Sequence, residues 1–369
     1  MALNEVGVVD ARVSVARVRG NVRRAVRDAM EAAQWRRFIT PGADVALKVN
    51  LGWDLFVPGS ITSPWVVEGV IETIREYVGQ VFVVESDQVL VSSERALRNS
   101  YIDRVCRKHN VPFVNMSKGR FAHVKLDGAL ALHEMDVPEI LHHTELITIP
   151  VMKTHNKTTI TGSIKNQWGC LDKLRHNFHP VVNEALVDIN RAARPRFAVL
   201  DATVSMEGDA PKSGRPRVTD LVMASGDFVA LEAVQAKVMG FDPAAIPHIQ
   251  NCARHGLGVA DLSRIEQAGD GAGATLSPAF VPAGHNLVSY LELVLRRSWL
   301  RRAAFDTPLF DLCRAGAILY YLAWYYLVKG RSIRDSILAH PVYGAQWRDE
   351  AWLPEPGAAP MRASNTRNR

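Results

Sequence analysis

The segment from residue 150 to residue 179, PVMKTHNKTTITGSIKNQWGCLDKLRHNFH, holds the densest group of side chains that could do chemistry. Its lysines are Lys153, Lys157, Lys165 and Lys173. A lysine supplies a compact positive charge, and the hydroxyl and backbone N–H groups around Thr161-Gly162-Ser163 add hydrogen-bond donors. The segment therefore predicts a site for a phosphate or a carboxylate, with a solvated basic loop as the alternative interpretation.

Three residues are candidate catalytic groups at such a site, namely His155, Asp201 and Lys153. His155 or Asp201 would move a proton, while Lys153, with Lys165 and Asn166, would bind the anion. Positioned acid–base groups accelerate a reaction by about 10²–10⁴-fold. Asp201 lies near the end of a predicted strand, within LDATVSMEGDAPKSGRPR (200–217). It could act there as a general base or cap a following turn, and both interpretations stay open.

Further polar residues fall at the ends of predicted strands and starts of predicted helices. Together they form the expected substrate-binding set of Lys48, Asn50, Thr161, Lys165, Asn166 and Asp227. For Asp227, at the start of a predicted helix, capping of that helix is the favoured interpretation.

A metal site is a further possibility. His-x-x-His, as in His176 and His179, brings two imidazoles to one side of a helical turn, and Glu207 could complete the ligand set. A variant of this hypothesis uses His155 and Cys170 with the same two histidines. The neighbouring lysines oppose a cation, and the four cysteines form no CxxC motif, which excludes a local zinc ribbon or ferredoxin cassette. The cofactor therefore stays unknown, with a metal or an iron–sulfur cluster as hypotheses that no ligand cassette supports.

The elements that must position these residues alternate between strands and helices. Strands are expected at 13–18, 44–51, 81–86, 111–116, 145–153, 197–204 and 220–225, and helices at 21–35, 64–78, 101–110 and 229–240. This alternation is typical of an α/β fold with a largely parallel sheet and flanking helices. In such sheets ligands bind in the crevice beyond the carboxyl ends of the strands, where the lysine-rich segment begins.

The charge of the chain is concentrated at its C-terminus. Residues 291–369 hold 12 Lys/Arg and 7 Asp/Glu, and residues 1–290 hold 32 and 31, so the net charges are +5 and +1. The near-neutral first part carries no RNA- or DNA-reading motif, which argues against nucleic-acid binding. The first residues, MALNEVGVVDARVSVARVRG, lack the apolar run of a signal peptide, so we expect a cytoplasmic protein with reduced thiols.

The C-terminal segment is also rich in aromatic residues. We expect an α/β domain over 1–290, a helical appendage over 291–353 and a disordered tail over 354–369. The uncharged run from Ala315 to Val328 is 14 residues long, which is short of the about 20 that a membrane-spanning helix needs. Its tyrosines, and the arginines before it, suit a helix lying on an anionic membrane, which would place the protein at the inner membrane face. Packing on the domain and a homodimer interface are the alternatives.

Five ordered blocks resemble the domain-of-unknown-function 362 family over roughly residues 44–270. They are ALKVNLGW (46–53) with TSPWVVEGVI (62–71) and VVESD (83–87), IPVMKTHNKTTITGSIKNQWGCL (149–171), VLDATVSMEGDAPKSG (199–214), SGDFVALEAVQAKVMGF (225–241) and HGLG (255–258). The resemblance implies an α/β domain and places Lys48, Asn50, Lys153, His155, Lys165, Asn166, Asp201 and Asp227 on the family's recurring polar positions. Many relatives carry a four-iron ferredoxin cassette, which hints at redox chemistry. This chain lacks that cassette, so a separate ferredoxin is an expected partner if electrons are transferred.

Three hypotheses about function follow from the sequence. The first is an enzyme that acts on an anionic small molecule, by acid–base or redox chemistry. The second is a non-catalytic carrier docked on a membrane, and the third is a protein that binds a metal or cluster.

Overall fold

The computed structural model describes residues 11–284, 287–299, 301–305 and 307–352, so the expected tail over 354–369 lies outside the described residues. Ten of the described strands form one sheet, whose main path has the order β12-β1-β11-β10-β7-β2-β3-β4, with β8 pairing β10 and β9. These strands are β1 (Ala11–Arg17), β2 (Val45–Lys48), β3 (Val81–Glu85), β4 (Phe113–Asn115), β7 (Glu145–Thr148), β8 (Val151–His155), β9 (Thr159–Thr161), β10 (Phe197–Glu207), β11 (Arg215–Ser225) and β12 (Ile265–Ala268). A separate hairpin pairs β5 (Phe121–Lys125) with β6 (Glu134–Pro138).

The sheet is mostly parallel, which confirms the expected fold class. The pairs β10–β7, β7–β2, β2–β3 and β3–β4 are parallel, as are β10–β8 and β1–β12. All four residues of β2 and all eleven of β10 are buried, as expected for strands covered on both faces.

Two parts of the sheet differ from the expectation of parallel strands. The short strand β9 pairs antiparallel with β8. Strands β10 and β11 form an antiparallel hairpin, and β11 also pairs antiparallel with β1. The connection from Gly208 to Gly214 is too short to return the chain for a parallel strand, which needs a crossover of a dozen residues or more.

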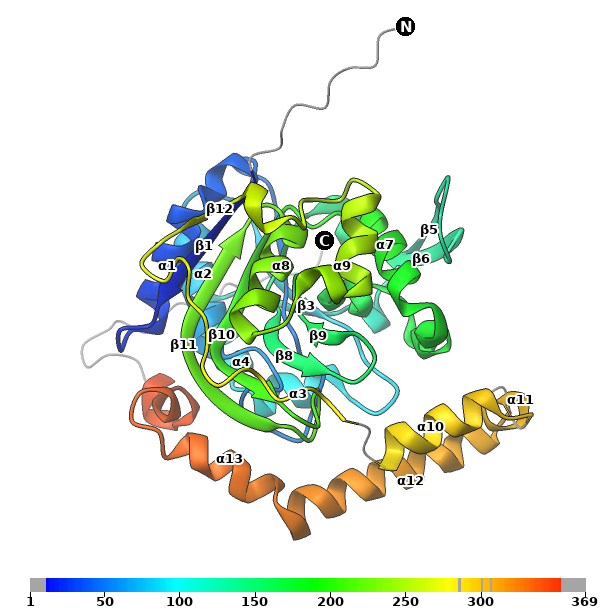
Figure 1. The fold of residues 1–369 in the computed structure, drawn as a ribbon. Helices are drawn as coiled ribbons and strands as arrows, with labels where there is room; N and C mark the ends of the chain where they lie inside the picture. The colour runs from blue at the N-terminus through cyan, green and yellow to red at the C-terminus, as the bar shows by residue number, and fades with distance from the viewer. Residues whose placement is uncertain (1–10, 285–286, 300, 306, 353–369) are drawn as a thin grey trace, which may run out of the picture.

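The helices flank both faces of this sheet (Figure 1). They are α1 (Val22–Ala32), α2 (Pro64–Ile74), α3 (Ser93–Asn99), α4 (Ile102–His109), α5 (Ile140–His143), α6 (Ser163–Asn166), α7 (Val182–Ala193), α8 (Phe228–Met239) and α9 (Pro247–Arg254). Alternate residues of β10 separate the two layers: Leu200 packs in the cluster that includes α7, α8 and α9, and Val199 in the cluster that includes α1, α2 and α4.

The C-terminal part of the described chain is helical and runs as an arc along one side of the domain (orange to red in Figure 1). It consists of α10 (Leu287–Arg297), α11 (Arg301–Phe305), α12 (Leu309–Ala323), a π-helical turn (Trp324–Val328) and α13 (Gly330–Leu338). Tyr321 packs edge-on against Trp53 with ring centroids 4.9 Å apart, and the Tyr325 hydroxyl donates to the carbonyl oxygen of Phe56 at 3.0 Å. The appendage therefore contacts the domain through its aromatic residues.

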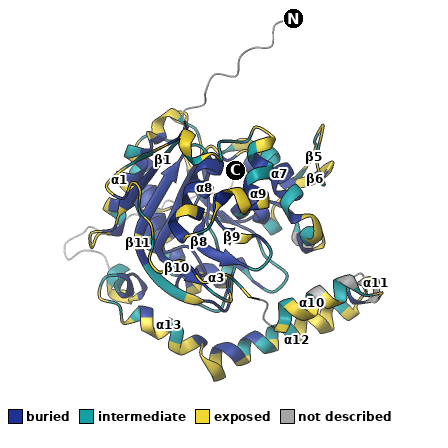
Figure 2. Ribbon diagram, in the orientation of Figure 1, coloured by how far each residue is buried: buried dark blue, intermediate teal, exposed yellow. Residues whose placement is uncertain are grey.

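The outward sides of α10, α12 and α13 are largely exposed, whereas the sheet is buried (Figure 2). Across the described residues, the helices fall short of the length and apolarity that crossing a membrane requires.

Candidate functional site

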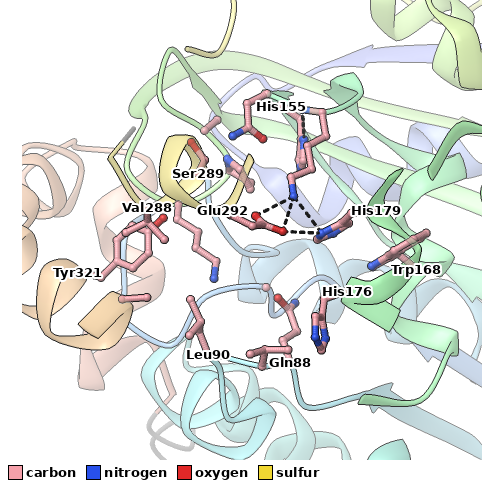
Figure 3. A pocket seen from close by; sticks show the side chains of 18 of the residues that line it. Gln88, Leu90, His155, Trp168, His176, His179, Val288, Ser289, Glu292 and Tyr321 are labelled. Carbon is pink, nitrogen blue, oxygen red and sulfur yellow. Dashed lines mark hydrogen bonds and ion pairs between the residues drawn. The ribbon is translucent and has the colours of Figure 1, made fainter. Parts of the chain in front are cut away.

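A cavity of about 640 Å³ lies at the carboxyl ends of the parallel strands, between the domain and the helices α10 to α12. Lys48 ends β2, Glu85 ends β3 and His155 ends β8, and all three line it. Its volume falls within the range of small-molecule pockets, about 300–1,000 Å³. Figure 3 shows Leu90, Val288 and Tyr321 on one side of the cavity and His155, His176 and His179 on the other.

The charged side chains of the cavity wall are mainly basic. Eight are cationic: Lys48, Lys153, Lys157, Lys165, Arg175, Lys212, Arg296 and Arg314. Three are acidic: Glu85, Asp209 and Glu292. An excess of positive charge in a recess of the protein focuses a field that attracts anions.

Lys48 is engaged within the protein. Its Nζ lies 2.8 Å from Glu85 and donates to the carbonyl oxygen of Val49 at 2.9 Å, and both charged side chains are buried. A Cβ at Gly169 would lie 2.8 Å from Nζ of Lys48 and from Oε1 of Glu85, so a glycine is required beside this pair. The expected substrate-binding Lys48 therefore has an internal partner.

Lys153 is held at the floor of the cavity by two acceptors. Its Nζ donates to Oδ1 of Asn50 at 2.9 Å and to the carbonyl oxygen of Ser60 at 2.7 Å. Burial, with repulsion from Lys165, lowers the pKa of Lys153 to about 7. A lysine with this pKa can both accept and release a proton near neutral pH.

Asn50 and Asn166 are bonded to each other. Nδ2 of Asn50 donates to Oδ1 of Asn166 at 3.0 Å. Nδ2 of Asn166 donates in turn to the carbonyl oxygen of Lys48 and to Oγ1 of Thr148, at 3.0 Å and 2.8 Å. This amide network positions Lys153.

Lys165 and Thr161 are two wall residues whose side-chain polar atoms lack a hydrogen-bond or ion-pair partner among the described residues. Lys165, on α6, is partly buried, and its side chain makes no hydrogen bond or ion pair with a described residue. Burial, with repulsion from Lys157, lowers the pKa of Lys165 to about 7. Oγ1 of Thr161, at the end of β9, is also without a partner, although the residue is only 4% exposed. A buried polar group without a partner costs free energy, so Oγ1 of Thr161 is a candidate to hydrogen-bond a ligand.

His155 is buried and its orientation selects one tautomer. Nδ1 accepts a hydrogen bond from the backbone N–H of Lys157 at 3.0 Å. Burial, with repulsion from Lys165, lowers the pKa of His155 well below its ordinary value. The neutral ring therefore carries its proton on Nε2, which acts as a donor.

Glu292 of α10 joins the site from the C-terminal appendage. Its carboxylate lies 2.8 Å from Nζ of Lys157, which lies 2.9 Å from Nδ1 of His179 (Figure 3). Burial lowers the pKa of His179 to about 4, and its ring stacks on Trp168 with centroids 5.4 Å apart. His179 is therefore neutral at pH 7.

The three expected metal ligands are not brought together. His176 and His179 line the cavity, but Glu207, at the end of β10, pairs with Arg215 at 2.5 Å and Arg217 at 3.1 Å. Cys170 is buried, and burial raises the pKa of its thiol to about 12.

Within the described residues, the side chains close enough to share a metal ion are Glu68, Glu72 and His109. Lys108 and Arg23 already pair with the Glu68 carboxylate, at 2.7 Å and 2.9 Å, which leaves it poorly suited to a cation.

Asp201 and Asp227 lie outside the cavity wall. Oδ2 of Asp201 accepts from the backbone N–H of Ser63 at 2.7 Å, at the N-terminus of α2, and Oδ1 accepts from the hydroxyl of Thr203 at 2.6 Å. Asp227 caps α8 by accepting from the N–H groups of Val229 and Ala230, at 2.9 Å and 2.8 Å. Both carboxylates support the start of a helix in this arrangement.

Sequence reasoning missed Lys212, Arg175 and Glu292 as wall residues. Nζ of Lys212 lies over the rings of Trp53 and Tyr321, 4.7 Å and 5.6 Å from their centroids, and burial lowers its pKa to about 8. Lys212 lies in the Gly- and Pro-rich loop after β10, and this loop composition could have marked it as a candidate site residue. No sequence pattern marks Glu292, because it lies far along the chain from the rest of the site.

Residues 45–237 match the model of a family described as a domain of unknown function, DUF362. Over 230 residues the chain is 31% identical to a thylakoid-associated protein of Synechocystis sp., covering 60% of this chain and 70% of that protein.

Two solved structures are similar in part. The lactate racemase apoprotein from Thermoanaerobacterium thermosaccharolyticum gives a TM-score of 0.37 at 11% identity, covering 67% of this chain and 57% of that one. A protein from Thermotoga maritima gives 0.39 at 12% identity, covering 60% and 58%. This chain therefore spans less than three fifths of either structure.

Proposed function

The chain belongs to the domain-of-unknown-function 362 family, and on that premise we propose that it is an enzyme that moves a proton on a small anionic molecule bound in the cavity. The observation that carries the proposal is the pair of unpartnered groups, Lys165 and Oγ1 of Thr161, in a wall that also holds Lys153 and His155. The anion is a carboxylate or a phosphate, since both accept from an ammonium and a hydroxyl group.

Each of these residues has a distinct role in the proposed reaction. Lys165 and Thr161 bind the anionic group. Lys153, with its pKa of about 7, takes the proton and returns it. His155 donates a hydrogen bond from Nε2 to the substrate oxygen that gains negative charge.

The anion site is tested by titrating inorganic phosphate and acetate into the protein by calorimetry. Lys165→Met should weaken both anions at least tenfold, because the cation that binds them is removed. Lys237→Met, an exposed lysine of α8 outside the cavity wall, is the matched control and should bind like the unaltered protein. Equal affinities of all three proteins would refute the site.

The proton transfer is tested by incubating the protein with a metabolite extract in D₂O and following deuterium by mass spectrometry. We expect one anionic metabolite to gain deuterium with the unaltered protein and not with Lys153→Met. Deuterium uptake that is the same with both proteins, or absent with both, would contradict the assignment.

We also propose that the appendage attaches the protein to an anionic membrane. Large apolar side chains of its helices face solvent: Trp299 is 89% exposed, Leu327 82% and Val328 72%. Exposed cations, among them Arg302 and Lys329, lie beside them in the chain and complement anionic lipid headgroups. The name of the Synechocystis relative, a thylakoid-associated protein, supports the same interpretation.

Co-sedimentation with phosphatidylcholine vesicles, with and without phosphatidylglycerol, tests this attachment. Replacing Trp299, Leu327 and Val328 by serine should reduce binding to the anionic vesicles at least tenfold. Val281→Ser, exposed but outside the appendage helices, is the control. Membrane attachment would be refuted if the triple variant still bound the anionic vesicles. It would also be refuted if the unaltered protein formed a dimer without lipid and the triple variant did not.

A further inference from the structure

The cavity changes in character from one side to the other. The strands, α6 and their adjoining loops contribute the lysines and histidines described above. The appendage contributes mainly apolar side chains, including Leu287, Leu291, Leu295, Phe305 and Phe310. Phe310 stacks on His176 with centroids 5.0 Å apart, so the two sides of the cavity meet at that contact.

Two of these apolar residues are exposed to solvent although they form part of the cavity wall. Leu287 is 56% exposed and Leu291 is 49% exposed. Apolar surface inside a recess is removed from water only when apolar atoms of a ligand cover it, and that removal is favourable. The wall therefore offers apolar surface that a hydrocarbon group could cover, beside the basic side chains that suit an anion.

The volume supports a ligand larger than an ion. About 640 Å³ corresponds to the liquid volume of about twenty water molecules, at about 30 Å³ each. Phosphate or acetate bound at Lys165 would leave most of this space unfilled.

We propose that the cavity binds an amphiphile with one anionic head group and a hydrocarbon chain. This inference rests on the proposed anion site and names its substrate class. The head group lies at Lys165 and Thr161, and the chain lies along Leu291, Leu295 and Phe310.

A chain-length series measured by calorimetry, with every ligand below its critical micelle concentration, tests the inference. Butyrate, octanoate and dodecanoate carry a carboxylate head group on chains of increasing length. Dodecyl phosphate carries a phosphate head group, and dodecanol has the same chain length without a charge. We expect Kd to fall about fourfold per added methylene until the cavity is full, which corresponds to about 0.8 kcal/mol per buried CH₂. Dodecanol should bind at least tenfold more weakly than the better of the two charged ligands, and the comparison of those two identifies the preferred head group.

Variants separate the chain from the head group. Leu291→Ser with Leu295→Ser should weaken dodecanoate at least tenfold and leave inorganic phosphate unchanged. Leu312→Ser, on the same appendage but outside the cavity wall and 68% exposed, is the matched control and should change neither. Lys165→Met should weaken both ligands.

Equal affinities for butyrate and dodecanoate, with both still lost in Lys165→Met, would overturn the amphiphile and leave the anion site intact. The amphiphile proposal would also be overturned if the affinity for dodecanoate were unchanged in the Leu291→Ser, Leu295→Ser variant or in Lys165→Met. If phosphate and every alkyl anion bind independently of Lys165, the proposed function itself fails.

Discussion

The carboxylate of Glu292 lies 2.8 Å from Nζ of Lys157, although the two residues are 135 positions apart in the chain. Lys157 follows β8, at the centre of the basic segment, and Glu292 belongs to α10. The C-terminal appendage thus places a negative charge against one lysine of the site. Lys165 has no such acidic partner among the described residues, which is why we propose it as the cation that binds the anion.

Replacing Glu292 by glutamine keeps the shape of the side chain and removes its charge. Because the net positive charge of the cavity rises, phosphate should bind about fivefold more tightly, the equivalent of about 1 kcal/mol. Calorimetry at low and high salt measures the effect, which should shrink as salt screens it. The control is Glu266→Gln on β12, which loses the ion pair between Glu266 and Arg12 of β1 at the surface. Weaker phosphate binding by Glu292→Gln would contradict this account.

Anion affinity should depend on pH through Lys165. Its pKa is about 7 in the free protein, and an anion binds the protonated form. The affinity for acetate should therefore level off below pH 6, fall about twofold between pH 6 and pH 7, and fall about fivefold between pH 7 and pH 8 as the ammonium loses its proton. Calorimetry from pH 6 to pH 9 tests this, and Lys165→Met should make the profile shallower, with the remaining slope due to Lys153, whose pKa is also about 7. An affinity that rises with pH has the wrong sign for this mechanism.

Gly169→Ala should destabilise the protein through the buried Lys48–Glu85 pair. The added Cβ would lie 2.8 Å from both charged atoms, so the pair must separate or shift. We expect a loss of about 3 kcal/mol in the free energy of unfolding, as when a buried ion pair is broken. Gly316→Ala in α12, where a Cβ meets nothing within 4 Å, should instead gain up to about 1 kcal/mol. Urea unfolding compares the two variants, and equal stabilities would contradict the prediction.

Asp201→Asn separates structural support from chemistry. The carboxylate binds the N-terminus of α2 through the N–H of Ser63, so the variant should lose about 1–3 kcal/mol of stability. Phosphate affinity and deuterium exchange should stay unchanged in the folded variant, because Asp201 does not line the cavity. A folded Asp201→Asn protein that binds phosphate normally but no longer exchanges deuterium would place Asp201 in the chemistry.

Local signals predicted much of the fold. Pro64 starts α2 as expected, and Gly240, with φ +88°, follows the last residue of α8. The hairpin of β10 and β11 was not predicted. Each strand is recognisable from its own residues, but the direction in which it pairs depends on which other strand lies next to it in the sheet. No periodicity in the sequence shows that β11 inserts between β10 and β1.

The candidate site was predicted in part for a similar reason. Lys153 and His155 belong to β8, and Lys165 lies only ten positions beyond His155, so their meeting in one cavity follows from local sequence. Asp201 and Asp227 carry the same signal of a carboxylate near a strand or helix end. That signal cannot distinguish a catalytic group from one that supports a helix. Glu292 came from a helix with no sequence link to the site.

The match to the family covers residues 45–237, whereas most of the apolar side chains of the cavity wall belong to residues beyond 284. Under the two proposals made above, the residues for proton transfer and most of the residues that would select the hydrocarbon chain lie in separate stretches of the chain. A chimera that keeps the first stretch and exchanges α10 to α12 for those of a relative should admit a different set of molecules to an unchanged proton-transfer centre. Evolution can diversify such a protein by recombination at one junction, without rebuilding its chemistry.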